Sequence, residues 1–234
     1  MATLNIFCAG AAQAVVTQIA EKFQRDSGNF VNASFGAVGA MKARVVAGDP
    51  ADVIVLTAAL IDELTAQELV VAGSRVDLGK VGTGVAVRAG TPLPAVANTR
   101  VLRGNLLAAT RILFPDPAIA TAGKVVMSAL DRLGITAEVR ARLQFFPNGY
   151  AAMNDLAQSG GALEMGITQI TEIMANKGVT LVGPLPAELQ NIAIYSAGLA
   201  TRSAHPERAR EFIRRLTGFN AQAVLSAAGF DVSS

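Results

Sequence analysis

Two stretches of the sequence place glycine between a strand and a helix, where main-chain N–H groups can hold an anion. Gly36 and Gly39 follow an alternating apolar segment over 30–35 and precede a helical apolar stripe. Gly10 follows the apolar segment 4–9 in the same way. A helix that begins at such a turn exposes unpaired N–H groups and a partial positive charge. The pattern indicates small-anion binding, although two spaced glycines are also typical of a plain turn in an α/β domain.

Residue counts exclude several other chemistries. The chain has one cysteine, Cys8, and one histidine, His205, so neither a zinc site nor a Cys/His catalytic pair is expected. The net charge is only +2, and no Lys/Arg cluster is interleaved with aromatics, which argues against nucleic-acid binding. No apolar run approaches the roughly 18 residues of a membrane span. We therefore expect no metal, no cofactor, no nucleic-acid partner and no direct membrane insertion, and we expect Cys8 to be a buried structural thiol.

Hydrophobic periodicity predicts the elements that position the glycine turns. The first eighty residues alternate strands and helices as β-α-β-α-β-α, which is typical of a doubly wound half-domain. One strand is predicted over 80–88 and is ended by the Gly/Pro-rich segment 89–94, after which a second α/β set begins. A long apolar strand over 191–200 precedes two final helices.

This order of elements predicts an α/β protein with two doubly wound lobes joined by two crossing strands. We expect lobe 1 to contain residues 1–80 and 197–234, and lobe 2 to contain residues 81–196. The ligand cleft is expected between the lobes, because small-molecule sites are common at domain interfaces.

Several motifs, in order along nearly the whole chain, resemble the periplasmic molybdate-binding proteins of ABC transporters. They are Phe7-Cys8-Ala9-Gly10-Ala11, Ser34-Phe35-Gly36, Ala47-Gly48-Asp49-Pro50-Ala51-Asp52-Val53, Asp116-Pro117 with Ala122-Gly123, and Ala227-Ala228-Gly229-Phe230. The resemblance implies the type II periplasmic-binding-protein fold, which agrees with the two lobes predicted above. It also implies a solute-binding protein that hands its ligand to an ABC permease. The location would be periplasmic if a signal peptide has been removed, and cytoplasmic otherwise.

The resemblance places the family's oxyanion pocket at Ala11, Val38, Ala122, Tyr150 and Gln169. The molybdate binders have serine hydroxyls at the positions of Ala11 and Val38, and a tyrosine at that of Gln169. Losing a hydroxyl removes a hydrogen bond worth about 1.5–3 kcal/mol to a charged ligand, whereas the main-chain N–H groups remain. We therefore predict a small-anion pocket that has changed from molybdate towards an organic carboxylate with an apolar body.

The predicted ligand-binding set combines the turns with polar side chains. It consists of Gly10, Ala11, Gly36, Ala37, Val38, Gly39, Thr121, Ala122, Gly123, Tyr150, Thr168 and Gln169. Thr168 and Gln169 are predicted at a helix start and can donate to a carboxylate, although threonine is also an ordinary helix cap there. Three basic residues near candidate site helices could neutralise further charge, but solvated surface positions are the better expectation for them: Lys42, Arg44 and Lys124.

Three functions stay open from the sequence. The first is the non-catalytic solute-binding protein. The second is an enzyme on the same scaffold, because proteins resembling this family include aconitate isomerases, which move a proton within a tricarboxylate. Such an isomerase needs an acid/base near the migrating proton, and Tyr150 is the best candidate, with Lys42 or Glu172 behind it. The third is a ligand-sensing domain, which would need a DNA-binding or signalling segment that the sequence does not show.

Overall fold

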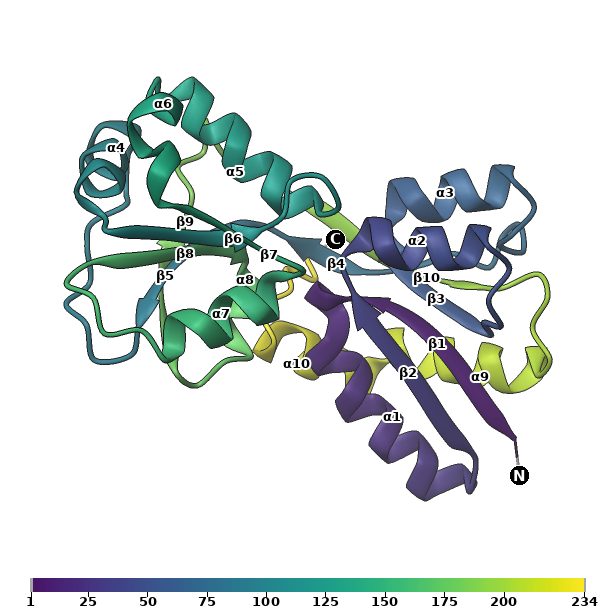
Figure 1. Cartoon of the computed structure of the whole chain (residues 1–234). Coiled ribbons are helices and arrows are strands. Elements are labelled where there is room, and N and C mark those ends of the chain that lie inside the picture. Colours follow the sequence, from purple (N-terminus) through teal and green to yellow (C-terminus); the bar gives the residue numbers. More distant parts are fainter. Residues whose placement is uncertain (1, 234) are drawn as a thin grey trace. The chain divides into compact units, whose positions relative to one another are not determined.

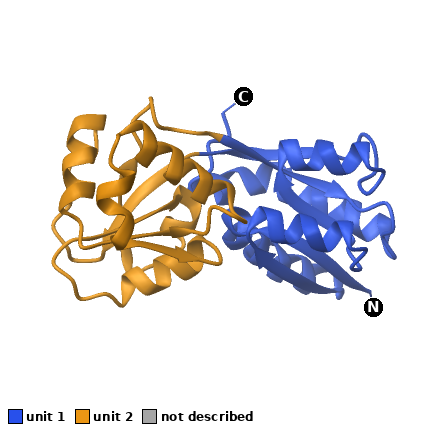
Figure 2. Cartoon of the chain, turned by 45° about the horizontal axis from the view of Figure 1, so that its top comes forward, with its two compact units in different colours: residues 1–81, 193–234 blue, residues 82–192 orange. Residues whose placement is uncertain are grey.

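The computed structural model describes residues 2–233, which form two compact units (Figure 2). Unit 1 runs to Val81 and resumes at Ala193, and unit 2 is Gly82–Ile192. The units differ from the predicted lobes mainly at residues 193–196, which belong to unit 1. The reason is that the strand containing them pairs along its length with strands of unit 1.

Within the described residues, the sheet of unit 1 has five strands in the order β2-β1-β3-β10-β4. They are β1 (Thr3–Ala9), β2 (Phe30–Gly36), β3 (Val53–Thr57), β4 (Val76–Val81) and β10 (Ala193–Leu199). Strand β1 is parallel to β2 and to β3, whereas β10 is antiparallel to β3 and to β4. The central strands β1 and β3 are apolar and buried on both faces, as expected where helices cover both sides of a sheet.

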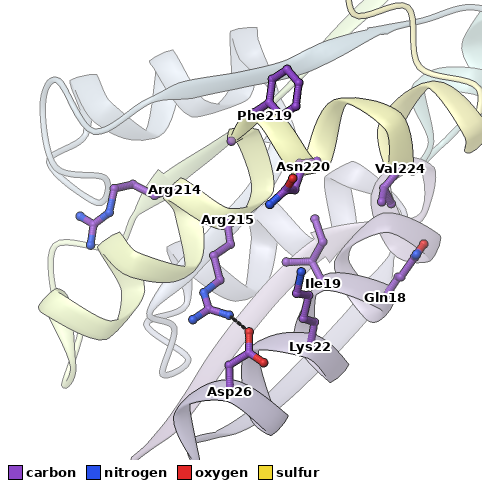
Figure 3. A pocket seen from close by; sticks show the side chains of 11 residues that line it. Gln18, Ile19, Lys22, Asp26, Arg214, Arg215, Phe219, Asn220 and Val224 are labelled. Atoms are coloured by element: carbon purple, nitrogen blue, oxygen red, sulfur yellow. Dashed lines mark hydrogen bonds and ion pairs between the residues drawn. The ribbon is translucent and has the colours of Figure 1, made fainter.

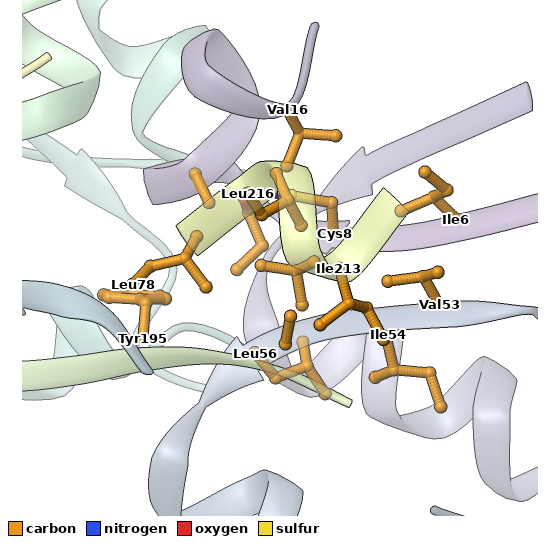
Figure 4. Close-up of a cluster of buried hydrophobic side chains, with 14 of the residues drawn as sticks. Ile6, Cys8, Val16, Val53, Ile54, Leu56, Leu78, Tyr195, Ile213 and Leu216 are labelled. Carbon is orange, nitrogen blue, oxygen red and sulfur yellow. Dashed lines mark hydrogen bonds between the residues drawn. The ribbon is translucent and has the colours of Figure 1, made fainter. Parts of the chain in front are cut away.

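Helices cover both faces of the unit 1 sheet. They are η1 (Gly10–Ala12), α1 (Gln13–Ser27), α2 (Val38–Val46), α3 (Ala58–Ala66), α9 (Pro206–Thr217) and α10 (Phe219–Ala227). Helices α2 and α3 lie on one face, and α1 and α9 lie on the other (Figure 1). Between α1 and α9, the rings of Phe23 and Phe212 meet edge to face with centroids 5.4 Å apart. The core includes Cys8, which is fully buried as predicted (Figure 4).

Unit 2 contains a second sheet, which has five strands within residues 82–192, in the order β7-β6-β8-β5-β9. They are β5 (Thr83–Arg88), β6 (Arg111–Pro115), β7 (Leu143–Phe146), β8 (Glu164–Gln169) and β9 (Val179–Pro184). Strands β6, β7 and β8 are parallel, and β5 is antiparallel to β8 and to β9.

The helices of unit 2 also lie on both faces of its sheet. They are α4 (Thr99–Ala108), α5 (Thr121–Arg132), α6 (Thr136–Val139), η2 (Arg140–Arg142), α7 (Gly149–Ala157) and α8 (Ile170–Met174). Along β6 the side chains alternate between two separate cores. Ile112 and Phe114 pack in the core with α4 and α5, and Leu113 packs in the core with α7 and α8. No helix among residues 2–233 is both long and apolar enough to cross a membrane.

The prediction of a single strand over 80–88 is wrong in one respect. The segment forms two strands, because β4 ends at Val81 and β5 begins at Thr83. Strand β4 pairs with β10 in unit 1, and β5 pairs with β8 and β9 in unit 2. The segment therefore does connect the two units, but each half takes its register from a different sheet.

Candidate anion-binding site

In unit 1, strand register brings the two predicted glycine turns together. Strands β1 and β2 are parallel, and their last residues, Ala9 and Gly36, are register partners. The turn that begins at Gly10 and the start of α2 at Val38 therefore lie side by side at the carboxyl edge of the sheet. Ligands of open α/β sheets commonly bind at this edge. All six predicted unit 1 residues lie there: Gly10, Ala11, Gly36, Ala37, Val38 and Gly39.

The start of α2 carries main-chain donors without a side-chain cap. Its N-cap residue is Ala37, which has no side-chain hydrogen bond to the helix. The neighbouring side chains Ala11 and Val38 are apolar and nearly buried. This edge of unit 1 therefore offers N–H groups and a helix dipole to an anion, but Ala11 and Val38 contribute no hydroxyl.

Unit 2 repeats this arrangement at the carboxyl edge of its parallel strands. The last residues of β6 and β7, Pro115 and Phe146, are register partners, so α5 and α7 begin near the same edge. Strand β8 is parallel to β6 and ends there at Gln169. The other six predicted residues lie at this edge: Thr121, Ala122, Gly123, Tyr150, Thr168 and Gln169.

Glycine at position 123 is required by the packing of the first turn of α5. A Cβ on Gly123 would overlap the carbonyl oxygen of Pro115 and the main chain of the turn that follows. The N-cap residue of α5, Ala120, has no side-chain hydrogen bond to the helix. The first N–H groups of α5 are therefore held close to the strand end without a side-chain cap, as in α2.

Contrary to the prediction, Thr168 is not at a helix start, and it does not cap a helix. It is a strand residue of β8, and α8 begins at Ile170. The strand extends this far because its last residue, Gln169, pairs with Thr83 of the antiparallel strand β5. The Thr168 hydroxyl instead donates to Glu172 Oε2 at 2.5 Å.

Glu172 is a buried carboxyl at this edge of unit 2. It accepts hydrogen bonds from the Thr168 hydroxyl and from the main-chain N–H groups of Gly149 and Gln169. Burial raises the pKa of Glu172 to about 7, and the three hydrogen bonds oppose that rise by favouring the ionised form. A carboxyl that titrates near neutral pH is suited to exchanging a proton.

Three more polar atoms at or near this cluster are buried without a hydrogen-bond partner. They are Thr83 Oγ1, Gln169 Oε1 and Thr171 Oγ1. Leaving such a group unpaired costs about 1–3 kcal/mol. Because buried polar groups in native proteins are almost always paired, these three atoms distinguish this cluster within the described residues.

Sequence reasoning missed Thr83 and Thr171 and gave Glu172 only a secondary place. The only local signal for Glu172 was an acidic residue within the apolar segment Ile170–Met174, four positions after Thr168. The contact between Glu172 and Gly149 depends on how α7 packs against α8. The sequence pattern gives no information on that packing.

The three basic residues that could have neutralised the charge of a ligand are instead paired with carboxylates or exposed to solvent. Lys42 Nζ lies 2.6 Å from Glu63 Oε1, and Arg44 Nε lies 2.8 Å from Asp49 Oδ2, while Lys124 is exposed. Among residues 2–233, no group of three or more His, Cys, Asp or Glu could hold a metal ion. The carboxyl edge of each sheet therefore contains main-chain donors and neutral side chains, and the edge in unit 2 also carries the titratable carboxyl of Glu172.

A surface groove of about 480 Å³ lies elsewhere in unit 1, between α1 and the α9–α10 junction (Figure 3). Its lining includes Lys22, Arg214 and the highly exposed Phe219. Its one acidic residue, Asp26, is bound to Arg215 at 2.6 Å. None of the predicted ligand-binding residues lines this groove.

Comparison with known proteins identifies relatives over 97% of the chain. An aconitate isomerase of Pseudomonas sp. is 26% identical, over 97% of this chain and 87% of its own length. A putative ABC transporter substrate-binding lipoprotein of Bacillus subtilis (strain 168) is 22% identical, over 97% of this chain and 86% of its own.

Among solved structures, the periplasmic molybdate-binding protein of Azotobacter vinelandii has the same fold. Its TM-score is 0.82 at 23% identity, and the match covers 99% of this chain and 100% of that one. The match confirms the predicted fold class, two α/β lobes of the periplasmic-binding-protein type. A family model described as bacterial extracellular solute-binding protein matches residues 4–231. The chain therefore belongs to the bacterial extracellular solute-binding proteins.

Proposed function

We propose that this solute-binding protein binds small organic carboxylates and that the carboxyl edge of each sheet contains main-chain donors suited to them. The observation that carries the proposal is the character of the uncapped helix starts. Helices α2 and α5 present main-chain N–H groups without side-chain caps, while the adjacent side chains Ala11, Val38 and Ala122 are apolar and nearly buried. The donors suit an anion, and the apolar walls suit a ligand with a hydrocarbon body.

The polar groups of unit 2 support the same ligand class. Thr168 and Gln169 lie together at the end of β8, and Tyr150 lies in the first turn of α7. The side chains of Gln169 and Tyr150 can each donate and accept a hydrogen bond, whereas the Thr168 hydroxyl already donates to Glu172 and can only accept another. A tetrahedral metal oxyanion without protons offers only acceptors, whereas a carboxylic or hydroxycarboxylic acid can offer both.

We further propose that the partner is an ABC permease and that the protein acts in the periplasm. Support comes from the family, whose description is extracellular, and from the relative described as an ABC transporter substrate-binding lipoprotein. A ligand carried to a permease should be released unchanged.

A thermal-shift screen tests the ligand class. The panel contains citrate, cis-aconitate, trans-aconitate, molybdate, tungstate, sulfate and phosphate. A ligand present at about one hundred times its dissociation constant stabilises the fold by about 2.7 kcal/mol, which is easily measured. We expect shifts with carboxylates, and a shift with molybdate or tungstate alone would refute the proposal.

A matched pair of variants locates the effect on α2. Val38→Asp places a negative charge at the N-terminus of the helix and should abolish the carboxylate shift by charge repulsion. Val46→Asp places the same charge at an exposed position at the other end of α2 and should leave the shift in place. Equal loss in both variants would argue against binding at the helix start.

A second candidate function is carboxylate isomerisation, which the buried carboxyl of Glu172 favours. Its pKa of about 7 is close to that of an effective acid/base at neutral pH, and its hydrogen-bond donor Gly149 is followed directly by Tyr150. The relative named as an aconitate isomerase supports this candidate at 26% identity. Tyr150 would then be the acid/base that contacts the substrate.

Nuclear magnetic resonance of the ligand distinguishes the two functions. Trans-aconitate is incubated with the protein in deuterium oxide, and deuterium incorporation or conversion to the cis isomer is followed. Turnover that is lost in Tyr150→Phe and kept in Tyr195→Phe, a change in the core of unit 1, would establish an enzyme. An unchanged ligand with all three proteins would establish a carrier.

A further inference from the structure

The N-terminus of α7 already holds a carboxyl of the protein itself. The Gly149 N–H donates to Glu172, and a Cβ on Gly149 would overlap both Glu172 Oε2 and the Thr168 hydroxyl. The Asn148 side chain accepts from the N–H of Ala151 at 2.9 Å. The helix start is therefore built around Glu172, and glycine is needed there so that the carboxyl can approach the main chain.

This carboxyl lies within a buried group of polar side chains. Thr83, Thr168, Gln169 and Thr171 are each at most 3% exposed, and Glu172 is 5% exposed. Oxygen atoms of Thr83, Gln169 and Thr171 have no hydrogen-bond partner. The Gln169 amide oxygen can only accept, so this buried atom lacks a donor, whereas the two threonine hydroxyls can donate or accept.

Charged and titratable side chains are few on the elements packed against Glu172. They are Tyr150 and Asp155 on α7, Glu164 on β8 and Arg88 on β5, while β9 and the remainder of α8 have none. Asp155 and Glu164 both pair with Arg111, and Arg88 is at the opposite end of β5 from Thr83. Within the described part of the chain, no ion pair neutralises Glu172.

We propose that Glu172 makes anion binding at this edge of unit 2 proton-linked, so that its carboxyl takes up a proton when an anion binds beside it. The inference rests on the proposed function, because it requires an anion near Tyr150 and Gln169. A negative charge within about 4–6 Å favours the neutral form of a carboxyl, and no cation compensates here.

The direction of the pH effect follows from linkage. Burial raises the pKa of Glu172 to about 7 in the ligand-free protein, and a bound anion raises it further. Affinity is therefore highest when Glu172 is protonated, and it weakens as the pH rises above about 7. At pH values between the pKa of Glu172 in the free protein and its pKa in the complex, binding requires the uptake of one proton. The affinity for the anion therefore falls by up to about tenfold for each unit that the pH rises.

Isothermal titration calorimetry tests the proposal with trans-aconitate, citrate and molybdate as probes. Each titration is repeated between pH 6 and pH 8.5 in buffers of different ionisation enthalpy, which counts the protons taken up. We expect the wild-type protein to take up close to one proton at pH 8 and its affinity to fall with pH. Glu172→Gln should bind without proton uptake and with little pH dependence, whereas the exposed control Glu188→Gln should behave like the wild type.

A second variant keeps the test independent of how well Glu172→Gln folds. Thr168→Val removes a hydrogen bond that favours the ionised form, so the fall in affinity should move to higher pH. Binding without proton uptake in the wild type, or uptake that persists in Glu172→Gln, would overturn the proton link alone. If only molybdate binds, the proposed ligand class fails, and the proton count on molybdate decides the link. If no probe binds, both proposals fail.

Discussion

Replacing Glu172 with glutamine should change how the stability of the protein depends on pH. Glutamine keeps the shape and an acceptor oxygen for Thr168 and Gly149, but it cannot ionise. Burial raises the pKa of Glu172 from its ordinary 4.5 to about 7. At about 1.36 kcal/mol for each pH unit, this difference corresponds to about 3 kcal/mol of unfolding free energy.

The sign of the effect follows from the raised pKa. In the folded protein the neutral carboxyl is favoured, so its contribution to stability is fully present below pH 4.5. It is lost as the pH rises through about 7, where folding must hold a buried charge. The wild type should therefore lose about 3 kcal/mol relative to Glu172→Gln between pH 4.5 and pH 8.

Urea unfolding followed by circular dichroism measures this difference at intervals between pH 4.5 and pH 8.5. Thr168→Val should steepen the loss, because the missing hydrogen bond raises the pKa of Glu172 further, and Thr168→Ser, which keeps the hydroxyl, should resemble the wild type. A stability difference between wild type and Glu172→Gln that stays constant with pH would refute the reasoning. So would a wild type that gains stability relative to the variant as the pH rises.

Three further predictions concern packing, a buried acid and ligand choice. Gly149→Ala should destabilise unit 2 by about 1–3 kcal/mol because the added Cβ overlaps Glu172 Oε2. Gly160→Ala, which has open space around the added Cβ, is the control. Equal urea midpoints for the two variants would contradict the close packing of Gly149 against Glu172. Asp52→Ala should cost at least about 2 kcal/mol, since the carboxylate accepts from Ser203 Oγ at 2.6 Å and from the Asn5 N–H at 2.8 Å; an unchanged melting temperature would count against it. The double variant Ala11→Ser/Val38→Ser adds two hydroxyl donors and should therefore bind molybdate at least about tenfold more tightly, as measured by calorimetry. An unchanged affinity for molybdate would exclude these two positions from the pocket.

The glycine turns of unit 1 were predictable from sequence because their signals are local. Alternation over 30–35, followed by Gly36 and Gly39, predicts a strand that turns into a helix, and β2 and α2 follow that pattern. The apolar character of β1 and β3 likewise predicts strands buried on both faces.

Features set by pairing between distant segments were not predictable in this way. The segment 80–88 looks like one strand, because nothing near Gly82 shows that the chain changes sheets there. Thr168 and Gln169 look like a helix start, but pairing with β5 extends β8 through both. The hydrogen bond from Gly149 to Glu172 depends on the packing of α7 against α8, and local patterns carry no information on that packing.

The most direct test of the proposed site is nuclear magnetic resonance mapping of main-chain amides. The isotopically labelled protein is titrated with citrate and trans-aconitate, and the N–H signals are followed. We predict the largest shifts at Ala11, Val38 and Ala122, with further shifts at Tyr150 and Gln169. Shifts confined to the groove around Phe219, or saturation with no change at Val38 and Ala122, would contradict carboxylate binding at the strand ends.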